Sequence, residues 1–317
     1  NALGSVVHGD MNGVQITGLA NLAGGTMRGV QLAGISNISG DNTVGLSAAG
    51  LVNITGDKAQ GVVISGLTSI GGDNNSGLMI SGFMNVTGNM ASGLHFSGVA
   101  NITGQSFGGL MASGLLNVVG EHMNGLQIAG IANITASKLN GVQVALCNYA
   151  TKARGLQIGL VNYYKEDMKG FQLGLVNANP DTKVQMMVYG GNATPANIGV
   201  RFKNQLFYTI LGVGSMYQGL NNKFSASASY RAGLSFPLYK GLSISGDLGY
   251  QHIEAFDNKD EVIPKRLYAL QARANLEYQF TRKFGIFATG GYGLTRFYNK
   301  SSNYDKGAII EAGIVLF

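Results

Sequence analysis

The sequence has no tryptophan, one cysteine and only four prolines among its 317 residues. A single cysteine excludes an internal disulfide and a zinc site built from cysteines. So few prolines, without a Gly-X-Y period, exclude collagen. Charged residues make up 12% of the chain and hydrophobic residues 45%, which is the reverse of the balance found in disordered chains. We therefore expect a folded protein.

Charge and aromatic side chains are both scarce in the first half of the chain. Residues 1–150 have a net charge of −2, whereas residues 151–317 have a net charge of +8. The first part also holds only three of the fourteen Phe residues and one of the fourteen Tyr residues. Because the two parts differ so much in composition, we expect two domains, residues 1–182 and 183–317.

No motif predicts catalysis or a bound cofactor. The four histidines are far apart, and the chain contains no Walker sequence, zinc-protease motif or nucleophile elbow. Asp41, Asp57 and Asp73 recur at one position of a repeat, which we interpret as a solvated turn rather than a calcium site. The basic second half offers no helix to enter a nucleic-acid groove. We expect no enzymatic activity, no metal, no cofactor and no nucleic-acid partner.

Glycine is abundant, at 49 residues, and it recurs with a period of sixteen. The first glycine of each unit occupies positions 13, 29, 45, 61, 77, 93, 109, 125 and 141. A second glycine and an asparagine follow five and eight positions later, as Gly18 and Asn21 do in the first unit. The consensus is G-[VL]-x-[IV]-x-G-[LIVF]-x-N-[IV]-x-G followed by four variable residues. A period of this length indicates stacked repeats.

The spacing of apolar residues in each unit predicts two short strands. In the first unit, apolar residues are spaced by two and then by three, and Gly18 interrupts the alternation at a corner where φ could be positive. Stacked units of this kind predict a parallel β-solenoid of 16-residue coils. We expect its interior to contain the file of Val14 equivalents and a ladder of Asn side chains, each donating and accepting hydrogen bonds along the axis. The alternative is that each unit is one strand of an antiparallel barrel, which the uniform turns and the scarcity of aromatic residues disfavour.

The residue after Val14 in each unit would then point outward. Its file is polar at both ends and apolar in the middle, where Val63, Met79 and Met111 stand; Met84 and Leu116 extend this stretch on a neighbouring file. An exposed apolar patch indicates an interaction surface, and Met suits adaptable contacts. We predict that these five residues dock another envelope protein. If the inward and outward positions are reversed, the Met residues belong to the core instead.

From about residue 183 the hydrophobic period becomes two. Eight strands are predicted, at 184–190, 196–203, 205–214, 224–237, 241–253, 265–280, 283–297 and 306–317. They have one apolar face, one polar face and often an aromatic residue near an end, which is typical of an antiparallel transmembrane β-barrel. A soluble β-sandwich is the alternative, because its strands also alternate.

The connections between these strands predict an orientation. Those after the second, fourth and sixth strands are tight, and those at 215–223, 254–264 and 298–305 are longer. Bacterial barrels have short periplasmic turns and longer external loops, so the solenoid is predicted to lie in the periplasm.

Four charged residues fall on the polar faces of the predicted strands: Arg231, Asp247, Arg273 and Glu277. An eight-stranded barrel has room for side chains but not for a wide channel. We expect these four residues to form a buried charge network that fills the lumen. A gated pore is the alternative.

The units GLQIGLVN (155–162) and GFQLGLVN (170–177) resemble the surface repeats of outer-membrane proteins from Gram-negative bacteria. The resemblance is looser over residues 13–140, where each unit has an extra residue at the bend. It implies a location in the cell envelope and supplies no catalytic mechanism.

Together these observations predict an outer-membrane protein whose barrel contacts lipid. Its solenoid would be a non-enzymatic scaffold or accessory subunit that binds other outer-membrane or periplasmic proteins. A surface receptor or adhesin that binds ligands through its long loops, and a small pore, are the alternatives. Residues 2–12 fit the tail of an earlier unit, so we expect the chain to continue upstream of Asn1.

Overall fold

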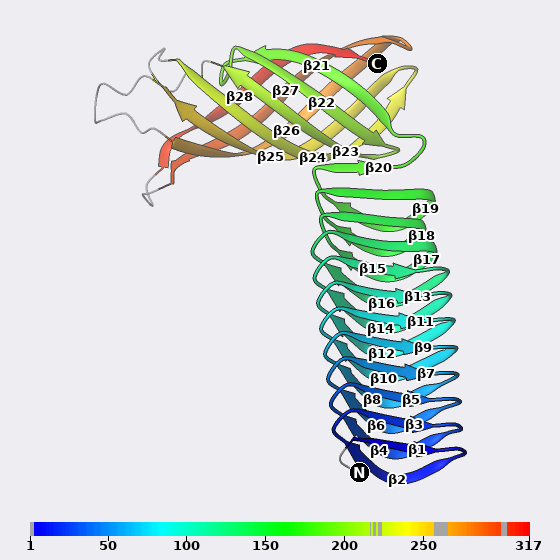
Figure 1. Cartoon of the computed structure of the whole chain (residues 1–317). Helices are drawn as coiled ribbons and strands as arrows, with labels where there is room; N and C mark the ends of the chain where they lie inside the picture. The colour runs from blue at the N-terminus through cyan, green and yellow to red at the C-terminus, as the bar shows by residue number, and fades with distance from the viewer. Residues whose placement is uncertain (1–2, 216, 218–219, 221–223, 257–265, 299–302) are drawn as a thin grey trace. The chain divides into compact units, whose positions relative to one another are not determined.

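The computed structural model of the chain is built from β-strands (Figure 1). It describes residues 3–215, 217, 220, 224–256, 266–298 and 303–317. The chain forms two compact units, residues 1–174 and 175–317. The division falls ahead of the expected boundary at 182/183, because the short strand β20 (Val176–Ala178) is grouped with the second unit. The predicted all-β class is confirmed.

The first unit is a parallel β-solenoid in which each coil contributes one long and one short strand. The long strands are β2 (Met11–Thr17), β4 (Met27–Ala33), β6 (Thr43–Ala49), β8 (Ala59–Ser65), β10 (Asn74–Ser81), β12 (Met90–Ser97), β14 (Ser106–Ser113) and β16 (His122–Ala129). The short strands are β1 (Gly4–Val7), β3 (Ala20–Ala23), β5 (Ser36–Ser39), β7 (Val52–Thr55), β9 (Thr68–Gly71), β11 (Met84–Thr87), β13 (Ala100–Thr103) and β15 (Leu116–Val119). In the last coils the turn between a short strand and the next long strand straightens. The two strands then merge into β17 (Ala132–Val144), β18 (Cys147–Ile158) and β19 (Val161–Leu173).

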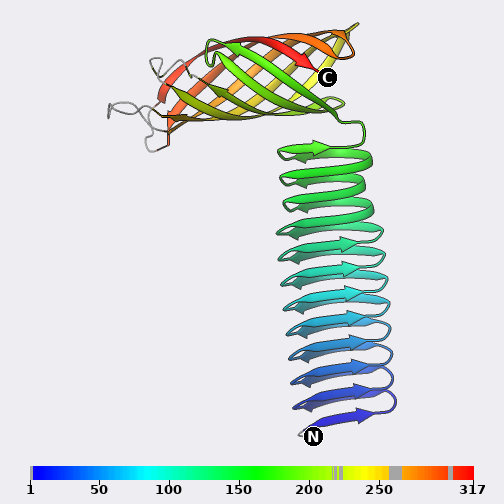
Figure 2. The same cartoon turned by 45° about the horizontal axis from the view of Figure 1, so that its top comes forward.

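Successive coils stack in register, as Figure 2 shows. Gly13 pairs with Gly29 on the long-strand side, and Asn21 pairs with Asn37 on the short-strand side. All of these ladders are parallel, so equivalent residues of neighbouring coils lie side by side in continuous files. The solenoid prediction is confirmed, and the antiparallel-barrel interpretation of the repeats is wrong.

Glycine recurs at three places in most coils because a Cβ would overlap the neighbouring coil, and two of these places illustrate different requirements. Gly29 has φ of 124°, which disfavours any other residue, and a Cβ there would lie 2.1 Å from the carbonyl oxygen of Gly13. Gly34 lies at the corner, where a Cβ would approach the carbonyl oxygen of Gly18 to 2.1 Å. The expectation that the corner glycine takes a positive φ is therefore wrong. The positive φ belongs to the Gly13 file, and the corner needs glycine because neighbouring coils approach closely there.

The side chains of the long strands are oriented opposite to the prediction. Val14 is 69% exposed and Ile16 is 59% exposed, whereas Gln15 between them is buried. The Gln15 file forms the interior: Gln15, Gln31, Ser47, Val63, Met79, His95, Met111, Gln127, Gln143, Gln157 and Gln172 are all buried. Strand alternation establishes which residues share a face, but it does not establish which face is inside. The Gln residues of this file can be buried because their amides hydrogen-bond along the stack, as Gln31 does to Gln15 at 2.9 Å.

The prediction that Val63, Met79 and Met111 form part of an exposed docking surface is therefore wrong. Each of these three residues is at most 4% exposed. Met79 packs with Val63, and Met111 belongs to a separate core cluster. Met84 and Leu116 lie on the short strands and are half-buried. The first three residues are therefore core, and the proposed outward patch does not exist in this form.

The predicted Asn ladder is confirmed. The side-chain amide of Asn21 donates to Oδ1 of Asn37 at 2.9 Å, and Asn37 donates to Oδ1 of Asn53 at 3.0 Å. The same bond repeats from Asn85 to Asn101 and onward through the later coils. The amides that follow Asn21 in this ladder, such as Asn37 and Asn101, thus use both a donor and an acceptor inside the solenoid.

The second unit contains a closed antiparallel barrel of eight strands. They are β21 (Lys183–Gly191), β22 (Ala196–Asn204), β23 (Phe207–Ser215), β24 (Ser225–Tyr239), β25 (Leu242–Ala255), β26 (Arg266–Thr281), β27 (Phe284–Phe297) and β28 (Asn303–Leu316). Closure occurs where β21 pairs with β28, from Met186 opposite Leu316 to Gly191 opposite Glu311. The eight-stranded prediction is confirmed and the β-sandwich alternative is wrong.

The two ends of the barrel differ. Tight connections follow β22, β24 and β26, and the C-terminus lies at the same end. We call this the short-turn end. Gln205, Lys240 and Gly241 have positive φ in two of these turns. The predicted long connections, 215–223, 254–264 and 298–305, fall largely outside the described residues.

Candidate functional site in the barrel interior

The barrel strands separate polar from apolar side chains. On β26, Leu270 and Leu276 are about half exposed on the outer surface, while Arg273 and Glu277 are buried. This follows from the period of two along a strand, since residues two apart point to the same side of the wall. The barrel interior is therefore lined by polar and charged side chains, and its outer surface by apolar ones.

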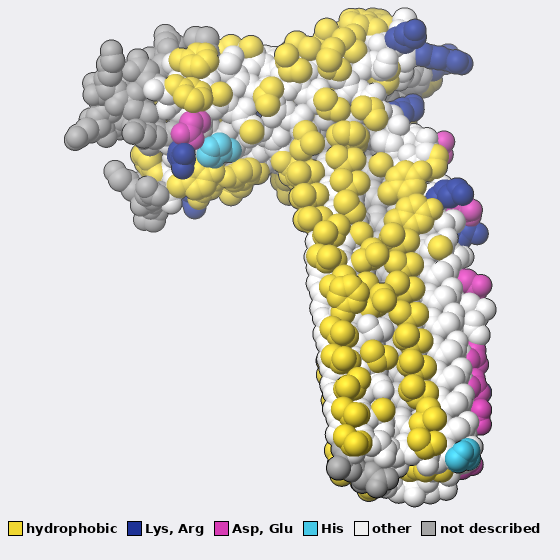
Figure 3. Space-filling view, viewed as in Figure 1, with side chains coloured by type: hydrophobic (Ala, Val, Ile, Leu, Met, Phe, Trp, Pro, Cys, Tyr) yellow, Lys and Arg dark blue, Asp and Glu magenta, His cyan; other side chains and the backbone are white. Residues whose placement is uncertain are grey.

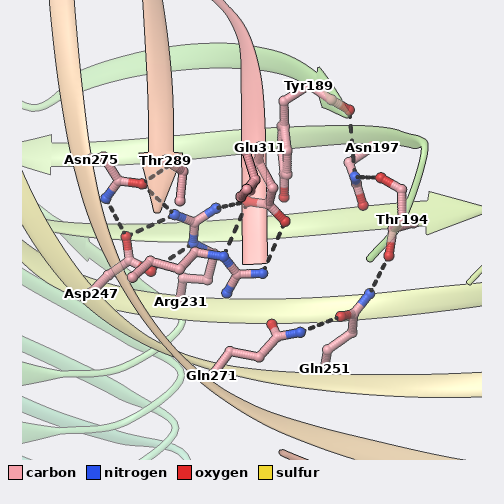
Figure 4. A network of polar contacts seen from close by, with 12 residues as sticks. Tyr189, Thr194, Asn197, Arg231, Asp247, Gln251, Gln271, Asn275, Thr289 and Glu311 are labelled. Carbon is pink, nitrogen blue, oxygen red and sulfur yellow. Dashed lines mark hydrogen bonds and ion pairs between the residues drawn. The ribbon is translucent and has the colours of Figure 1, made fainter. Parts of the chain in front are cut away.

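An Arg–Asp pair lies at the centre of the interior (Figure 4). Arg231 of β24 donates two hydrogen bonds to Asp247 of β25, from Nε to Oδ1 and from Nη2 to Oδ2, both at 2.8 Å. The Asp247 carboxylate also accepts a hydrogen bond from the Tyr208 hydroxyl at 2.7 Å and from the Asn275 amide at 2.8 Å. Bidentate geometry with further donors is what holds a buried carboxylate ionised.

Glu311 connects this pair to a second arginine. Arg273 donates to both Glu311 carboxylate oxygens at 3.1 Å, and Arg231 Nη1 lies 3.7 Å from Oε2 of the same carboxylate. Asn275 adds a further link, because its Oδ1 accepts from Arg231 at 3.1 Å and from Thr289 at 2.7 Å. The side chains from β24, β25, β26, β27 and β28 thus form one continuous network across the lumen.

A separate pair lies nearer the short-turn end. Arg201 of β22 donates to Oε2 of Glu277 at 2.6 Å and to Oε1 at 2.9 Å. Its Nε donates to Gln185 at 2.6 Å. The guanidinium also lies 5.9 Å from the ring centroid of Tyr208, which itself bonds to Asp247. Tyr208 therefore contacts both groups.

The buried charges of the interior balance. Among the described residues, those buried and formally charged are Arg201, Arg231, Arg273, Asp247, Glu277 and Glu311. Three cations face three anions, and each takes part in an ion pair of 3.1 Å or less. A cavity of about 490 Å³ opens at the short-turn end and reaches Glu277, and a smaller one of about 90 Å³ reaches Gln271 from the other end. The network occupies the space between them, so this arrangement is suited to closing the lumen.

All four charged residues singled out from the sequence lie in this interior. Arg231 pairs with Asp247, but Arg273 and Glu277 do not pair with each other; their partners are Glu311 and Arg201. Sequence reasoning missed these two partners. In β22, Ile198 and Val200 are exposed and Arg201 is buried. This alternation is visible in the sequence, and it could have identified Arg201 as an interior residue.

Other kinds of site are not found in the described ranges. No group of three or more His, Cys, Asp or Glu side chains there is arranged to hold a metal ion. Nor do those ranges contain a helix with the length and apolar character needed to span a bilayer.

No family model matches the sequence, and no curated protein matches it. One solved structure similar to this chain is the N-terminal β-barrel domain of Pseudomonas aeruginosa OprF. The match has 15% identity and a TM-score of 0.31, and it covers 42% of this chain and 93% of that chain.

Proposed function

We propose that this protein is an outer-membrane protein, anchored by its barrel and carrying a non-enzymatic solenoid that acts as a scaffold or accessory module. The observation that carries the proposal is the polarity of the barrel. Its exposed residues include Val188, Leu248 and Leu276, while six charged residues are buried inside. In water this surface would be an extensive aggregation-prone patch, whereas in lipid it is the surface that a barrel requires.

Aromatic clusters at both ends of the barrel support the same proposal. At the short-turn end the ring of Phe280 lies 4.9 Å from that of Tyr278 and 6.0 Å from that of Phe284. At the opposite end the ring of Tyr268 lies 6.2 Å from that of Tyr250. On β26, Tyr268 and Tyr278 are separated by a rise of about 26 Å, at about 3.4 Å per residue and a tilt of about 40°. That spacing fits the two aromatic girdles that flank the apolar band of a membrane barrel.

Membrane insertion can be tested by placing a charge on the outer surface. Leu248→Arg puts a cation in the middle of the apolar band, where it costs about 2–4 kcal/mol. Thr281→Arg adds the same side chain to an exposed position at the end of β26. We expect the Leu248 variant to co-float poorly with phosphatidylcholine vesicles and the Thr281 variant to behave like the wild type. Equal flotation of both variants would contradict the proposal.

The ion-pair network supports an anchor rather than a pore. Arg231, Asp247 and Glu311 fill the centre of an eight-stranded barrel, which has little interior space to begin with. We expect no stable single-channel conductance from the full chain in planar bilayers. Regular openings would favour the pore.

The scaffold role requires partners. We propose that the solenoid lies in the periplasm, as an even number of barrel strands would require, and that it holds other envelope components. Gentle detergent extraction of the tagged protein, followed by mass spectrometry, should recover a stoichiometric partner, and added protease should not reach the solenoid in intact cells. A clean monomer with a protease-accessible solenoid would favour a surface receptor instead.

A further inference from the structure

Most of the solenoid surface on three of its sides is uncharged. In the first coil, residues 14–23 include no Asp, Glu, Lys or Arg, and the same holds for the equivalent stretches of the following coils. These stretches are 30–39, 46–55, 62–71, 78–87, 94–103, 110–119, 126–135, 142–150 and 156–164. They comprise the outward part of the long strand, the corner and the short strand. Charged residues such as Asp57 and Lys58 are confined to the turn edge and the start of the long strand.

The same three sides are apolar. The long-strand face exposes Ile64 and Leu94, and the short-strand face exposes Leu22 and Ile70. The corner between them exposes Leu19, Ile35, Leu51, Leu67, Phe83, Leu115, Ile131, Leu146 and Leu160. In Figure 3 the apolar side chains form columns along the solenoid axis, and charged side chains follow one edge. At about 4.8 Å per coil these columns extend for about 50 Å, well beyond the apolar patches that soluble monomers expose.

The backbone beneath these columns is hydrogen-bonded. Besides the strand ladders, the corner continues the pattern: Leu51 N–H donates to the carbonyl of Ile35, and Leu67 N–H donates to that of Leu51, both at 2.9 Å. The buried amides are bonded along the Asn ladder. A surface in hydrocarbon must satisfy its backbone polar groups internally, and the stacked coils do so along their length.

We propose that lipid acyl chains cover the solenoid, which lies in the plane of a membrane with its corner in the hydrocarbon and its turn edge in water. The inference rests on the proposed function, because the chain must reside at a membrane. A second copy of the chain could cover one flat face, but it would leave the corner and the other face exposed. Acyl chains cover all three sides, and these sides carry mainly Leu, Ile and Val with little charge to set a protein register.

The direction of the apolar columns and of the charged turn edge gives the orientation of the solenoid relative to the membrane. Asp41, Asp57 and Asp73 recur at the turn of three successive coils, so the charged edge runs parallel to the solenoid axis. A rod placed across the bilayer would bury several of these carboxylates in hydrocarbon. A rod lying in the interface keeps them in water, as an amphipathic interfacial helix keeps its polar face there.

The absence of tryptophan allows a direct test, because one introduced Trp is the sole indole reporter. Leu115→Trp places it at the corner, and Gln105→Trp places it at an exposed turn position in the same region; neither substitution changes the charge. Leu248→Trp reports on the outer surface of the barrel. Each full-length variant is reconstituted into phosphatidylcholine vesicles with or without bromine on the acyl chains, which quenches nearby indole fluorescence.

We expect the brominated vesicles to remove most of the fluorescence of Leu115→Trp and Leu248→Trp and little of that of Gln105→Trp. Quenching at Leu248 without quenching at Leu115 would overturn the inference and leave the proposed function intact. Quenching at neither position would overturn the proposed function as well.

Two further results would also overturn the inference. A blue-shifted but unquenched Trp at position 115 would mean that protein, including a second copy of the chain, covers the corner. Equal quenching at positions 105 and 115 would mean that the turn edge is immersed too. A second pair, Leu67→Trp and Lys58→Trp, repeats the comparison at another coil in case one variant fails to fold.

Discussion

The solenoid and the barrel both bury many polar side chains, but of different kinds. The solenoid interior holds neutral amides such as Asn101 and Gln143, whereas the barrel interior holds ion pairs such as Arg231–Asp247. The difference follows from the strand pairing. A parallel, in-register stack places like residues next to one another, while an antiparallel barrel places unlike residues opposite one another.

A stack of like residues requires side chains that bond to copies of themselves. An amide has a donor and an acceptor, so Asn85, Asn101 and Asn117 can form a continuous chain. A carboxylate has acceptors only, and stacked carboxylates would repel one another. In the barrel, neighbouring strands carry different residues, so Arg231 of β24 can bury its charge against Asp247 of β25. Strand topology thus selects which polar residues each interior can hold.

The largest expected difference between the two units is the loss of stability when a glycine is replaced by alanine. In Gly93→Ala, the added Cβ would lie 2.2 Å from the Gly77 carbonyl oxygen, at a φ of 106°. We expect this variant to lose about 5 kcal/mol of local stability, since overlap and backbone strain add. In the barrel, Gly290→Ala meets no atom within 4 Å and should cost less than about 1 kcal/mol. Hydrogen exchange of the full chain in detergent, read by mass spectrometry, measures both; equal losses would refute the close stacking.

The next largest effect is expected in the ion pairs. Asp247→Ala leaves the buried guanidinium of Arg231 without its bidentate acceptor, and we expect a loss of about 4 kcal/mol from the barrel. Asp247→Leu combined with Arg231→Met removes both charges and should recover most of that stability. Hydrogen exchange in β24 and β25 distinguishes the two variants. A double variant as unstable as the single one would show that the pair itself is not what stabilises this region.

A charge placed in the amide ladder tests the topological argument. Asn101→Asp replaces the donor to Asn117 by a buried anion, and we expect a loss of about 3 kcal/mol from the solenoid. Asn101→Ser is the control, because Ser69 already occupies the equivalent position of another coil. It should cost about 1 kcal/mol. If both variants lose the same stability, charge is not what the stack excludes.

The smallest expected effect concerns pH. Burial lowers the pKa of His95 from 6.5 to about 4. The unfolded chain therefore takes up this proton first, so the contribution is present above pH 6.5 and is lost as the pH falls from 6.5 towards 4. At pH 5 we expect the solenoid to be less stable by about 2 kcal/mol than at pH 7. His95→Gln, which matches the Gln residues of that file, should remove this part of the pH dependence; an unchanged profile would contradict the assignment.

Much of the fold was predictable because periodicity reports which residues lie together. The sixteen-residue period predicted the solenoid, and the period of two placed all eight barrel strands within a few residues of their observed bounds. The same periodicity could not say which face of the solenoid is inside. In both units the apolar face of the strands is the outer one. The prediction that the Val14 file points inward is therefore wrong, and it places Val63, Met79 and Met111 on the surface, whereas they are buried.

The charge network was predicted in part for a similar reason. Alternation placed Arg231, Asp247, Arg273 and Glu277 inside, but the partner of each depends on which strands face each other across the lumen. Arg201 lies 76 residues from Glu277 in sequence. Such a pairing depends on barrel closure and register, which strand periodicity does not contain.

The in-register stacking of near-identical coils has a consequence for how the gene can change. Each coil meets its neighbours through the same glycine, amide and aliphatic positions, so an in-frame duplication or loss of one unit creates an interface of the kind already present. The coils ending at Gly155 and Gly170 show that even the number of residues per coil can vary while the register at glycine is kept. Selection could therefore change the length of the rod one coil at a time, leaving the barrel and its ion pairs untouched.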